Sequence, residues 1–377
     1  MKLIDVRSAL KRNRIVFSTY KKFTDNDYRS NLIDYLIKKD GKTRKTIKEE
    51  ISLIKDYWKC DTMYYYRYRL YEKELTTEEL LDYVPPYYFY NFYMPTMYDE
   101  SRRNIADSKM RMHEFFVSKN IDTPPLAATI RYGKIYDSGG ERISYKGLMA
   151  ILRKSGCPKF FLKPDTGRGG KGIYRLEKIR SEIFINDDLI DEDYFASLTK
   201  NKDFVIQESI SQRKDLKAIY PASVNTLRVI TQFREKKGRI CAIILRMGRN
   251  GSFVDNSSIG GIFTSVDTST GNISKTGHLL HSNMKHEKHP DTGFSFDGFT
   301  LHEWGNIKQG IISIAEKAPE FPDIAWDIAI TNDGIKVIEF NLNYGLDQLQ
   351  CCIGGMRRRL NINPYIAMGY KQYYLNL

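Results

Sequence analysis

The sequence lacks the features that mark membrane-spanning and exported proteins. Within its 377 residues, no apolar run approaches the ~20 residues that a membrane-spanning helix requires. Charged residues interrupt segment 1–17 every few positions, so this segment contains no signal-peptide core. We therefore expect a soluble protein with no transmembrane segment.

Cysteines are few, and their spacing is not that of a disulfide framework or a metal site. The chain has 5 of them, an odd number, with no CxxC pair, which favours reduced thiols and a cytoplasmic location. Four histidines, at 278, 281, 286 and 289, share no evident helix or strand, so we do not expect zinc there. The cysteines are Cys60, Cys157, Cys241, Cys351 and Cys352.

No long tract of lysine and arginine is present, although the chain is basic. With 59 Lys and Arg against 46 Asp and Glu, its net charge is +13. The basic residues are scattered and no nucleic-acid-binding module is recognisable, so we expect no nucleic-acid partner. A field of this sign attracts small anions, such as nucleotides and acidic glycans.

The pattern changes along the chain from helical to mixed. Helical spacing covers 25–39 and 45–58, and Thr76 with Glu79 forms a capping box before another helix. The stretch 83–95 is aromatic and contains a pair of prolines, which favours irregular packed structure over a surface that stacks on glycans. A helix is predicted over 104–120. From about 125 strands and short helices alternate, an α+β pattern, and 249–303 is typical of long loops.

A glycine-rich segment, KFFLKPDTGRGGKGIYRLE (159–177), is the strongest local signal. An apolar run ending in Lys163 precedes the loop 167–172, and a second strand-like run follows it. A dinucleotide-binding fingerprint needs a helix after the loop, and a P-loop needs GK followed by Ser or Thr, so both are excluded. The remaining readings are a glycine hairpin whose amides cover phosphates, with Lys163 and Lys171 adding charge, or an exposed turn without a ligand.

A second hairpin, WDIAITNDGIKVIEFNLNYG (326–345), carries carboxylates. A three-residue loop ending in a left-handed glycine would place Thr331 opposite Ile335 and Asp327 opposite Glu339. Strand alternation then puts Glu339, Asn341 and Asn343 on one face. Hard oxygen ligands converging here predict a magnesium site at Asp327, Glu339 and Asn341, the alternative being polar edge residues that face water.

These two hairpins, in this order and with SVNTLRVIT (223–231) between them, resemble the ATP-grasp superfamily, and in particular its sugar-transfer-associated family. The resemblance implies an α+β ATP-grasp fold, in which two α+β subdomains clamp ATP. We divide the chain into a mainly helical region over 1–104, a lid subdomain with the glycine hairpin over 105–203, and a C-terminal subdomain with the metal site over 204–377.

The resemblance also implies roles for individual residues. In FVIQESI (204–210), Gln207, Glu208 and Ile210 match positions that hold adenine, and Asp215 is our choice for the ribose. Arg228 and Arg246 correspond to arginines that steady the transferred phosphate, while VDNSSIGG (254–261) resembles a loop near the acceptor. The expected ATP-binding residues are Lys109, Lys163, Gly169, Gly170, Lys171, Gln207, Glu208, Ile210 and Asp215. The expected substrate-binding residues are Asn256, Ser258, Gly260, Gly261 and Asn343, of which Gly260 and Gly261 would offer amide donors.

The implied activity is an ATP- and Mg²⁺-dependent carboxylate–amine ligase that works through an acyl phosphate. By resemblance, the carboxylate would be a uronic acid of a bacterial surface polysaccharide or of its nucleotide-sugar precursor, and the amine an amino acid or a related compound. Two alternatives stay open: a kinase that phosphorylates a hydroxyl, and a nucleotide-binding module without chemistry.

Overall fold

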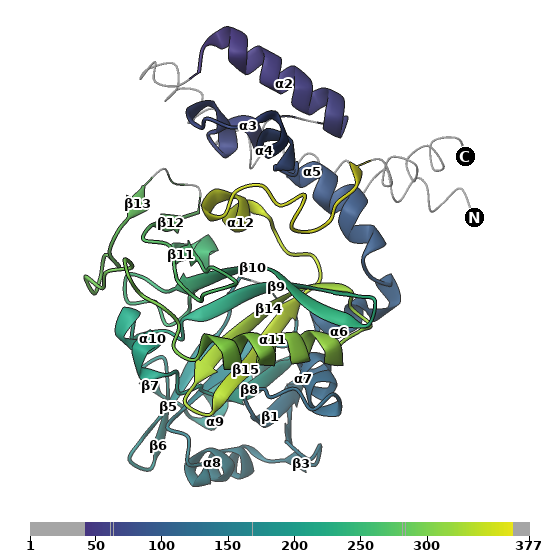
Figure 1. The fold of residues 1–377 in the computed structure, drawn as a ribbon. Helices are drawn as coiled ribbons and strands as arrows, with labels where there is room; N and C mark the ends of the chain where they lie inside the picture. The colour runs from purple at the N-terminus through teal and green to yellow at the C-terminus, as the bar shows by residue number, and fades with distance from the viewer. Residues whose placement is uncertain are drawn as a thin grey trace. The chain divides into compact units, whose positions relative to one another are not determined.

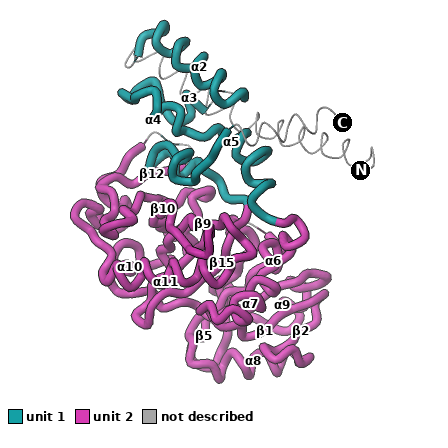
Figure 2. Tube along the Cα trace, turned by 45° about the vertical axis from the view of Figure 1, so that its right-hand side comes forward, with its two compact units in different colours: residues 1–98, 281–283, 343–377 teal, residues 99–280, 284–342 magenta. Residues whose placement is uncertain are grey.

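The structure, a computed structural model, describes residues 42–60, 62, 64–167, 169–280, 282 and 284–364. The helix predicted over 25–39 lies outside these residues. The chain forms two compact units (Figure 2). Unit 1 holds the described residues up to Tyr98, Ser282 and those from Asn343 onward, and unit 2 holds Asp99–Leu280 and Met284–Leu342.

Unit 1 is helical, as predicted for the N-terminal region. The helix expected over 45–58 is present, and the capping box is confirmed, since the Thr76 hydroxyl accepts from the Glu79 amide while the Glu79 carboxylate accepts from the Thr76 amide. Its elements are α2 (Arg44–Trp58), α3 (Tyr64–Arg67), η1 (Leu70–Glu72), α4 (Thr77–Asp82), α5 (Pro86–Tyr88), the π-helix η2 (Phe89–Tyr93), η3 (Met94–Thr96) and α12 (Asp347–Cys352).

The aromatic stretch 83–95 forms short helical pieces, and its rings pack inward. Tyr88, Phe89 and Tyr93 are buried, with Phe89 stacked on Tyr93 at 5.4 Å between ring centroids. Phe89 also meets Tyr344 from the C-terminal part of the unit, edge to face at 5.3 Å. Buried aromatic packing therefore accounts for these rings.

Unit 2 contains two antiparallel sheets (Figure 1). The first has eight strands in the order β3-β2-β1-β8-β4-β5-β6-β7, and its apolar face is covered by residues of α8 and α9 such as Leu148 and Phe195. β8 lies in this sheet although it follows the predicted boundary at 203. The elements are β1 (Leu126–Arg131), β2 (Lys134–Asp137), β3 (Arg142–Ile143), α8 (Tyr145–Lys154), β4 (Lys159–Pro164), β5 (Tyr174–Ile179), β6 (Glu182–Ile185), β7 (Asp188–Leu189), α9 (Glu192–Thr199) and β8 (Phe204–Glu208).

The second sheet has seven strands in the order β13-β12-β11-β10-β9-β14-β15. Helix α11 lies across strands β9, β10 and β15 (Figure 1), where Gly238 and Gly310 leave room for its close approach. The elements are α10 (Lys214–Ile219), β9 (Thr226–Arg234), β10 (Lys237–Met247), η5 (Ser257–Ile259), β11 (Ile262–Ser265), β12 (Gly277–Leu279), β13 (Lys285–His286), α11 (Trp304–Lys317), β14 (Asp323–Thr331) and β15 (Gly334–Asn341).

The single helix predicted over 104–120 is wrong in one respect, because the chain breaks at Ser108. This residue is extended, with φ −117° and ψ 123°, and its hydroxyl caps the next helix by accepting from the Arg111 amide. The elements here are η4 (Glu100–Arg102), α6 (Arg103–Asp107) and α7 (Lys109–Ser118). The break makes Lys109 the first residue of α7 rather than part of a continuous helix.

Among the described residues, none of the five cysteines forms a disulfide. In the part of the chain that the structure describes, no helix combines the length and apolar character needed to cross a bilayer.

Candidate active site

The hairpin of β14 and β15 brings the two predicted carboxylates together. Asp327 pairs with Glu339, as the register predicts, but the predicted loop is wrong: Thr331 pairs with Gly334 rather than with Ile335. The turn is thus one residue shorter than expected. A bulge in β15 next to Glu339 adds one residue and restores the predicted pairing.

Asp327 is bound by both predicted arginines. In the sheet register, Arg228 on β9 lies beside Asp327, and its Nε and Nη2 donate to the two carboxylate oxygens at 2.5 and 3.0 Å. Arg246 on β10 adds a third contact at 3.0 Å. Burial alone would raise the pKa of Asp327, but these two guanidinium groups hold it below its usual range.

Glu339 is in the opposite situation. It has no ion pair of its own among the described residues, and burial together with the neighbouring charge of Asp327 raises its pKa. Lys109 and Arg228 oppose this rise only in part. A buried carboxylate beside another carboxylate is stabilised by an additional cation.

Asn341 supplies the third polar group. Its side-chain Nδ2 is buried and has no hydrogen-bond partner in the described part of the protein. No three His, Cys, Asp or Glu side chains gather as metal ligands among the described residues, so an ion here would need the Asn341 amide as well as Asp327 and Glu339. Carboxylate and amide oxygens are ligands that Mg²⁺ accepts, so this donor set fits the ion.

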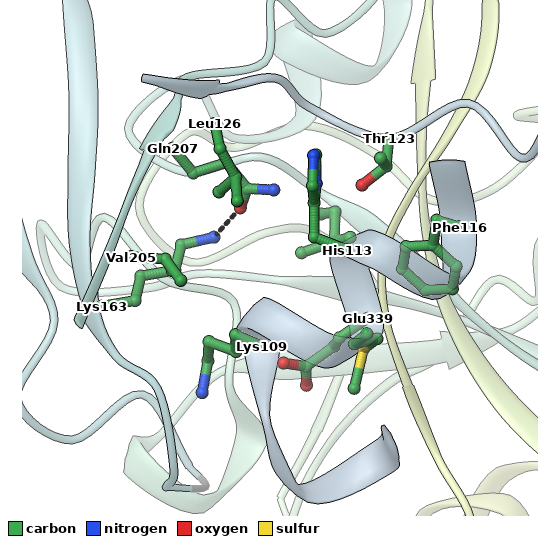
Figure 3. Close-up of a pocket in the computed structure, with 11 residues that line it drawn as sticks. Lys109, His113, Phe116, Thr123, Leu126, Lys163, Val205, Gln207 and Glu339 are labelled. Atoms are coloured by element: carbon green, nitrogen blue, oxygen red, sulfur yellow. Dashed lines mark hydrogen bonds between the residues drawn. The ribbon is translucent and has the colours of Figure 1, made fainter. Parts of the chain in front are cut away.

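A cavity opens beside Glu339 between α7, the strands β4 and β8, and β15 (Figure 3). It encloses about 330 Å³, including open solvent at its mouth. Apolar side chains form much of the wall and charged groups gather at Lys109, Lys163 and Glu339. The lining residues are Lys109, Met112, His113, Phe116, Thr123, Leu126, Lys163, Val205, Gln207, Ile338 and Glu339.

Lys163 is the predicted phosphate-binding lysine of β4, and it points into this cavity (Figure 3). Its Nζ donates to Gln207 Oε1 at 2.7 Å. Burial, the largest cause, and the nearby charge of Lys109 lower the pKa of Lys163 to about 8, although the charge of Glu339 opposes this shift. When no phosphate is bound, the charged form of Lys163 is therefore less favoured than that of a surface lysine.

Two polar residues of the cavity escaped the sequence analysis. His113 Nδ1 and Thr123 Oγ1 are buried and lack hydrogen-bond partners among the described residues. Because His113 lies four positions after Lys109 on α7, the helical period places both on one face, and that spacing is a signal that could have identified His113. Thr123 has no such signal, since it lies in the irregular segment before β1.

Asp165, directly after β4, connects the start of the glycine loop to the start of α7 through hydrogen bonds. Its carboxylate accepts from the Ser108 hydroxyl at 3.0 Å and from the Met110 amide at 2.8 Å. Its carbonyl accepts from the amide of Lys109, whose Nζ in turn donates to the carbonyl of Gly167 at 3.3 Å. A carboxylate at this helix start is favoured by the helix dipole and positions Lys109 beside the loop.

The glycine loop itself has the backbone that its sequence predicts. Gly167, Gly169, Gly170 and Gly172 all have positive φ values, in a range that favours glycine, and a strand, β5, follows the loop as expected. Lys171 is exposed. The loop approaches the segment 252–261: a Cβ on Gly169 would lie 3.7 Å from both Asn256 Nδ2 and Ser258 Oγ. The rings of Phe161 and Phe253 stack nearby at 6.2 Å.

The model of the sugar-transfer-associated ATP-grasp family matches residues 88–362. The chain belongs to this family. The predicted family and the α+β ATP-grasp fold class are thereby confirmed.

Individual proteins add less than the family model. No curated protein matches the chain in sequence. Similar solved structures include D-alanyl-alanine synthetase A from Vibrio cholerae, with 12% identity, TM-score 0.38, and coverage of 72% of this chain and 64% of that chain. VanG D-Ala:D-Ser ligase from Enterococcus faecalis has 12% identity, TM-score 0.39 and coverages of 70% and 60%. D-cycloserine synthetase has 10% identity, TM-score 0.42 and coverages of 72% and 73%.

In this ATP-grasp chain, only one of the residues predicted to hold adenine or ribose lines the cavity. Gln207 does, and its Nε2 donates to the carbonyl of Pro124 at 3.0 Å. Glu208 accepts from the Ser155 hydroxyl at 2.8 Å, and Ile210 follows the end of β8. The carboxylate of Asp215 is bound at both oxygens by Arg213, at 2.8 and 2.7 Å. The roles of these residues stay predictions.

The loop 254–261 does not offer the amide pair that we expected. The Gly260 amide donates to the Ser257 carbonyl and the Gly261 amide to the Asn256 carbonyl, both within the loop, because Gly260 ends the 3-10 helix η5 in a left-handed conformation. Asn256 Oδ1 accepts from the amide and hydroxyl of Ser258. The two glycine amides are thus already used in this conformation.

Asn343 does not share a strand face with the metal candidates. β15 ends at Asn341, and Asn343 belongs to unit 1. The predicted alternation fails here because the chain leaves the sheet after Asn341.

Asp255 is a further residue that the sequence analysis did not single out. Its Oδ2 accepts from the Thr226 amide at 3.2 Å and also from the Thr226 hydroxyl. It lies 3.6 Å from Arg246 Nη2, whose guanidinium donates to the same hydroxyl at 2.9 Å. Asp255 therefore joins the loop 254–261 to the arginine that binds Asp327.

Proposed function

We propose that the protein is an ATP-dependent carboxylate–amine ligase. Membership of the ATP-grasp family supports ATP binding and ligase chemistry in general. The observation that carries the proposal is the gathering of Lys109, Lys163 and Glu339 on one cavity, with Glu339 paired to the Asp327 that Arg228 and Arg246 bind.

Each group has a chemical task in this proposal. Lys163 and Lys109 neutralise nucleotide phosphates at the charged part of the cavity, and the glycine loop covers them from the lid sheet. Arg228 and Arg246 bind the oxygens of the transferred phosphate or of the carboxylate, a role in which their Nε and Nη2 atoms exchange the present contacts with Asp327 and Thr226. A substrate carboxylate takes the γ-phosphate, and an amine then displaces it to form an amide, releasing ADP and phosphate.

Magnesium fits this arrangement. Asp327, Glu339 and Asn341 are the residues that would hold it, and the ion would supply positive charge to the triphosphate. The raised pKa of Glu339, caused by burial and by Asp327, supports a cation at this point.

The proposed substrates rest on family membership. Its association with sugar transfer supports a uronic acid of a bacterial surface polysaccharide or its precursor as the carboxylate, and an amino acid or related amine as the acceptor. Cytoplasmic location is part of the proposal, and the lack of disulfides among the five described cysteines is compatible with it.

A substrate matrix tests the proposal. The purified chain is incubated with ATP, Mg²⁺ and combinations of uronic acids and amino acids, and both ADP release and product mass are measured. We expect ADP, free phosphate and an amide. Phosphate retained on the product would identify a kinase instead, and normal Mg–ADP binding without turnover on any pair would favour a module without chemistry.

A further inference from the structure

The hydroxyl of Thr226 connects an arginine of the candidate site to the loop 254–261. Thr226 Oγ1 accepts from Arg246 Nε at 3.2 Å and from Arg246 Nη2 at 2.9 Å. The same hydroxyl donates to Asp255 Oδ2, which also accepts from the Thr226 amide at 3.2 Å. Because a hydroxyl has one proton to donate and two lone pairs that accept, these three contacts use the Thr226 hydroxyl completely.

The strand register fixes the sheet side of this arrangement. Thr226 begins β9 and pairs with Arg246 on β10, and two residues further along β9, Arg228 pairs with Asp327 on β14. Since side chains alternate along a strand, Thr226, Arg228 and their partners lie on one face of the sheet. Asp255 instead reaches this face from the loop that follows β10.

A close turn of the backbone sets the position of Asp255. A Cβ on Gly261 would lie 2.7 Å from the carbonyl oxygen of Asp255 and 2.9 Å from that of Asn256, so the loop needs a glycine to fold back on itself here. The Gly261 amide donates to the Asn256 carbonyl at 3.1 Å. The place of the Asp255 carboxylate therefore depends on how the loop 254–261 turns.

The two arginines that bind Asp327 differ in their other partners. Among the described residues, Asp327 is the one carboxylate that forms an ion pair with Arg228, whereas Arg246 has Asp327 at 3.0 Å and Asp255 at 3.6 Å. The side chain of Arg246 is also less exposed, 8% against 18% for Arg228. A buried charge needs a counter-charge beside it, and Asp255 is the one that Arg246 has in addition to Asp327.

The electrostatics of Arg246 agree with this geometry. Burial would lower the pKa of its guanidinium group, but the charges of Asp255, Asp327 and Glu339 raise it above its usual range. Asp255 comes first among these three charges. Arg246 therefore keeps its charge although it is buried.

We propose that Asp255 is a positioning residue for Arg246: together with the Thr226 hydroxyl, it holds the guanidinium group at the carboxylate hairpin and links it to the loop 254–261. When Nε and Nη2 of Arg246 exchange their contacts with Thr226 for substrate oxygens, Asp255 remains as a second carboxylate for this buried charge. A change in the loop around a bound substrate would move Asp255 and, with it, the arginine. The part that Arg246 plays in the reaction rests on the proposed ligase function.

Nuclear magnetic resonance of the arginine Nε–H groups tests the positioning. The signals of Arg246 and Arg228 are identified by their loss in Arg246→Lys and Arg228→Lys. We expect Asp255→Ala and Thr226→Val to shift the Arg246 signal and to speed its hydrogen exchange about 10-fold or more, the scale of one charge-assisted hydrogen bond. Exchange at Arg228, whose Nε donates to Asp327, should change less than about 2-fold, as for an indirect effect.

Matched substitutions separate the hydroxyl from the charge. Thr226→Ser keeps the hydroxyl and should keep the slow exchange at Arg246, whereas Thr226→Val has the same shape without it. Asp255→Asn keeps an oxygen that can accept from Thr226 but removes the charge, so its effect should be intermediate. Asp297→Asn makes the same charge change at an exposed position between β13 and α11 and should leave the Arg246 signal unchanged. Circular dichroism checks folding, and Asp255→Asn takes the place of any variant that unfolds.

Steady-state kinetics with the substrates of the matrix test the consequence for the reaction. Asp255→Ala should lower kcat about 10-fold or more, the scale of one charge-assisted hydrogen bond. The KM for ATP should stay within about 2-fold, since Asp255 does not line the cavity beside Glu339. Combining Asp255→Ala with Thr226→Val should lower kcat by no more than about 2-fold beyond the larger single effect, because the two residues act as one unit.

Unchanged exchange at Arg246 in both Asp255→Ala and Thr226→Val would overturn the positioning role. Wild-type kcat in both variants would overturn its part in the reaction. An absence of ADP and amide with the wild-type protein would count against the ligase proposal alone, because the exchange measurement does not depend on turnover. The two failures are therefore distinguishable.

Discussion

The two hairpins of the candidate site differ in what holds them in place. Every residue of β14 is buried, and Asp327 is bound by Arg228 of the adjacent strand β9 and by Arg246 of β10. The β4–β5 hairpin instead ends in a loop with exposed residues and four left-handed glycines. The carboxylates are thus pre-positioned by the sheet, whereas the loop has the backbone freedom that covering a ligand requires.

The largest effect should come from the buried hairpin. Glu339→Gln removes a carboxylate that has no ion pair in the described structure, so its loss should act on the metal and not on the arginines. We expect Mg²⁺-dependent ADP release to fall about 100- to 1000-fold, the range for losing one preorganised electrostatic contact. Steady-state assays across Mg²⁺ concentrations measure it, with circular dichroism as the folding control. Full activity would remove Glu339 from the metal assignment.

Asp327→Asn distinguishes the role of Asp327 from that of Glu339 in the same hairpin. This variant should also lose Mg²⁺-dependent ADP release, but it additionally leaves Arg228 and Arg246 without their buried partner. We expect the free energy of unfolding to fall by about 3 kcal/mol, as for breaking a buried ion pair. Glu339→Gln should change it by less than about 1 kcal/mol, because it removes repulsion between carboxylates. Equal urea unfolding curves for the two variants would contradict the ion-pair network.

Lys163, at the base of the glycine hairpin, should show its lowered pKa in nucleotide binding. As pH rises through about 8, the free protein loses the charge of Lys163 while the bound phosphates still favour it. The affinity for Mg–ADP should therefore decrease above that pH. Lys163→Met should weaken binding by at least ~1 kcal/mol and remove the pH step. Fluorescence titrations from pH 7 to pH 9.5 test both, and a step that persists in the variant would assign it to another group.

The smallest effect concerns the loop itself. Gly169→Ala and Gly140→Ala both place a Cβ at positive φ, +77° and +87°, so each should cost about 1 kcal/mol of folding free energy. Gly140 has nothing within 4 Å, whereas Gly169 approaches Asn256 and Ser258. Only Gly169→Ala should therefore raise the KM for ATP. If the free-energy cost of the substitution falls on the ATP-covering conformation of the loop, the increase should be about 3-fold or more. Equal KM values in both variants would mean that the loop does not cover the nucleotide.

Local sequence patterns were sufficient to predict the structure where the conformation of a short segment depends on its own residues. The capping box of Thr76 and Glu79, the strand–glycine loop–strand order around Lys163, and the Asp327–Glu339 pairing could all be predicted from sequence. The last succeeded although the turn was misjudged, since a bulge in β15 cancelled the error of one residue. A bulge depends on packing against neighbouring strands, and no local pattern indicates it.

The sequence by itself determined the family, the order of the two hairpins and the residue types that bear charge. Only the tertiary structure decided how those charges are shared: Asp327 is bound by two arginines, and Glu339 is left with a raised pKa. The physical reason is that strand register brings together residues about 100 positions apart, such as Arg228 and Asp327. Burial then determines which of those charges still lacks a counter-ion.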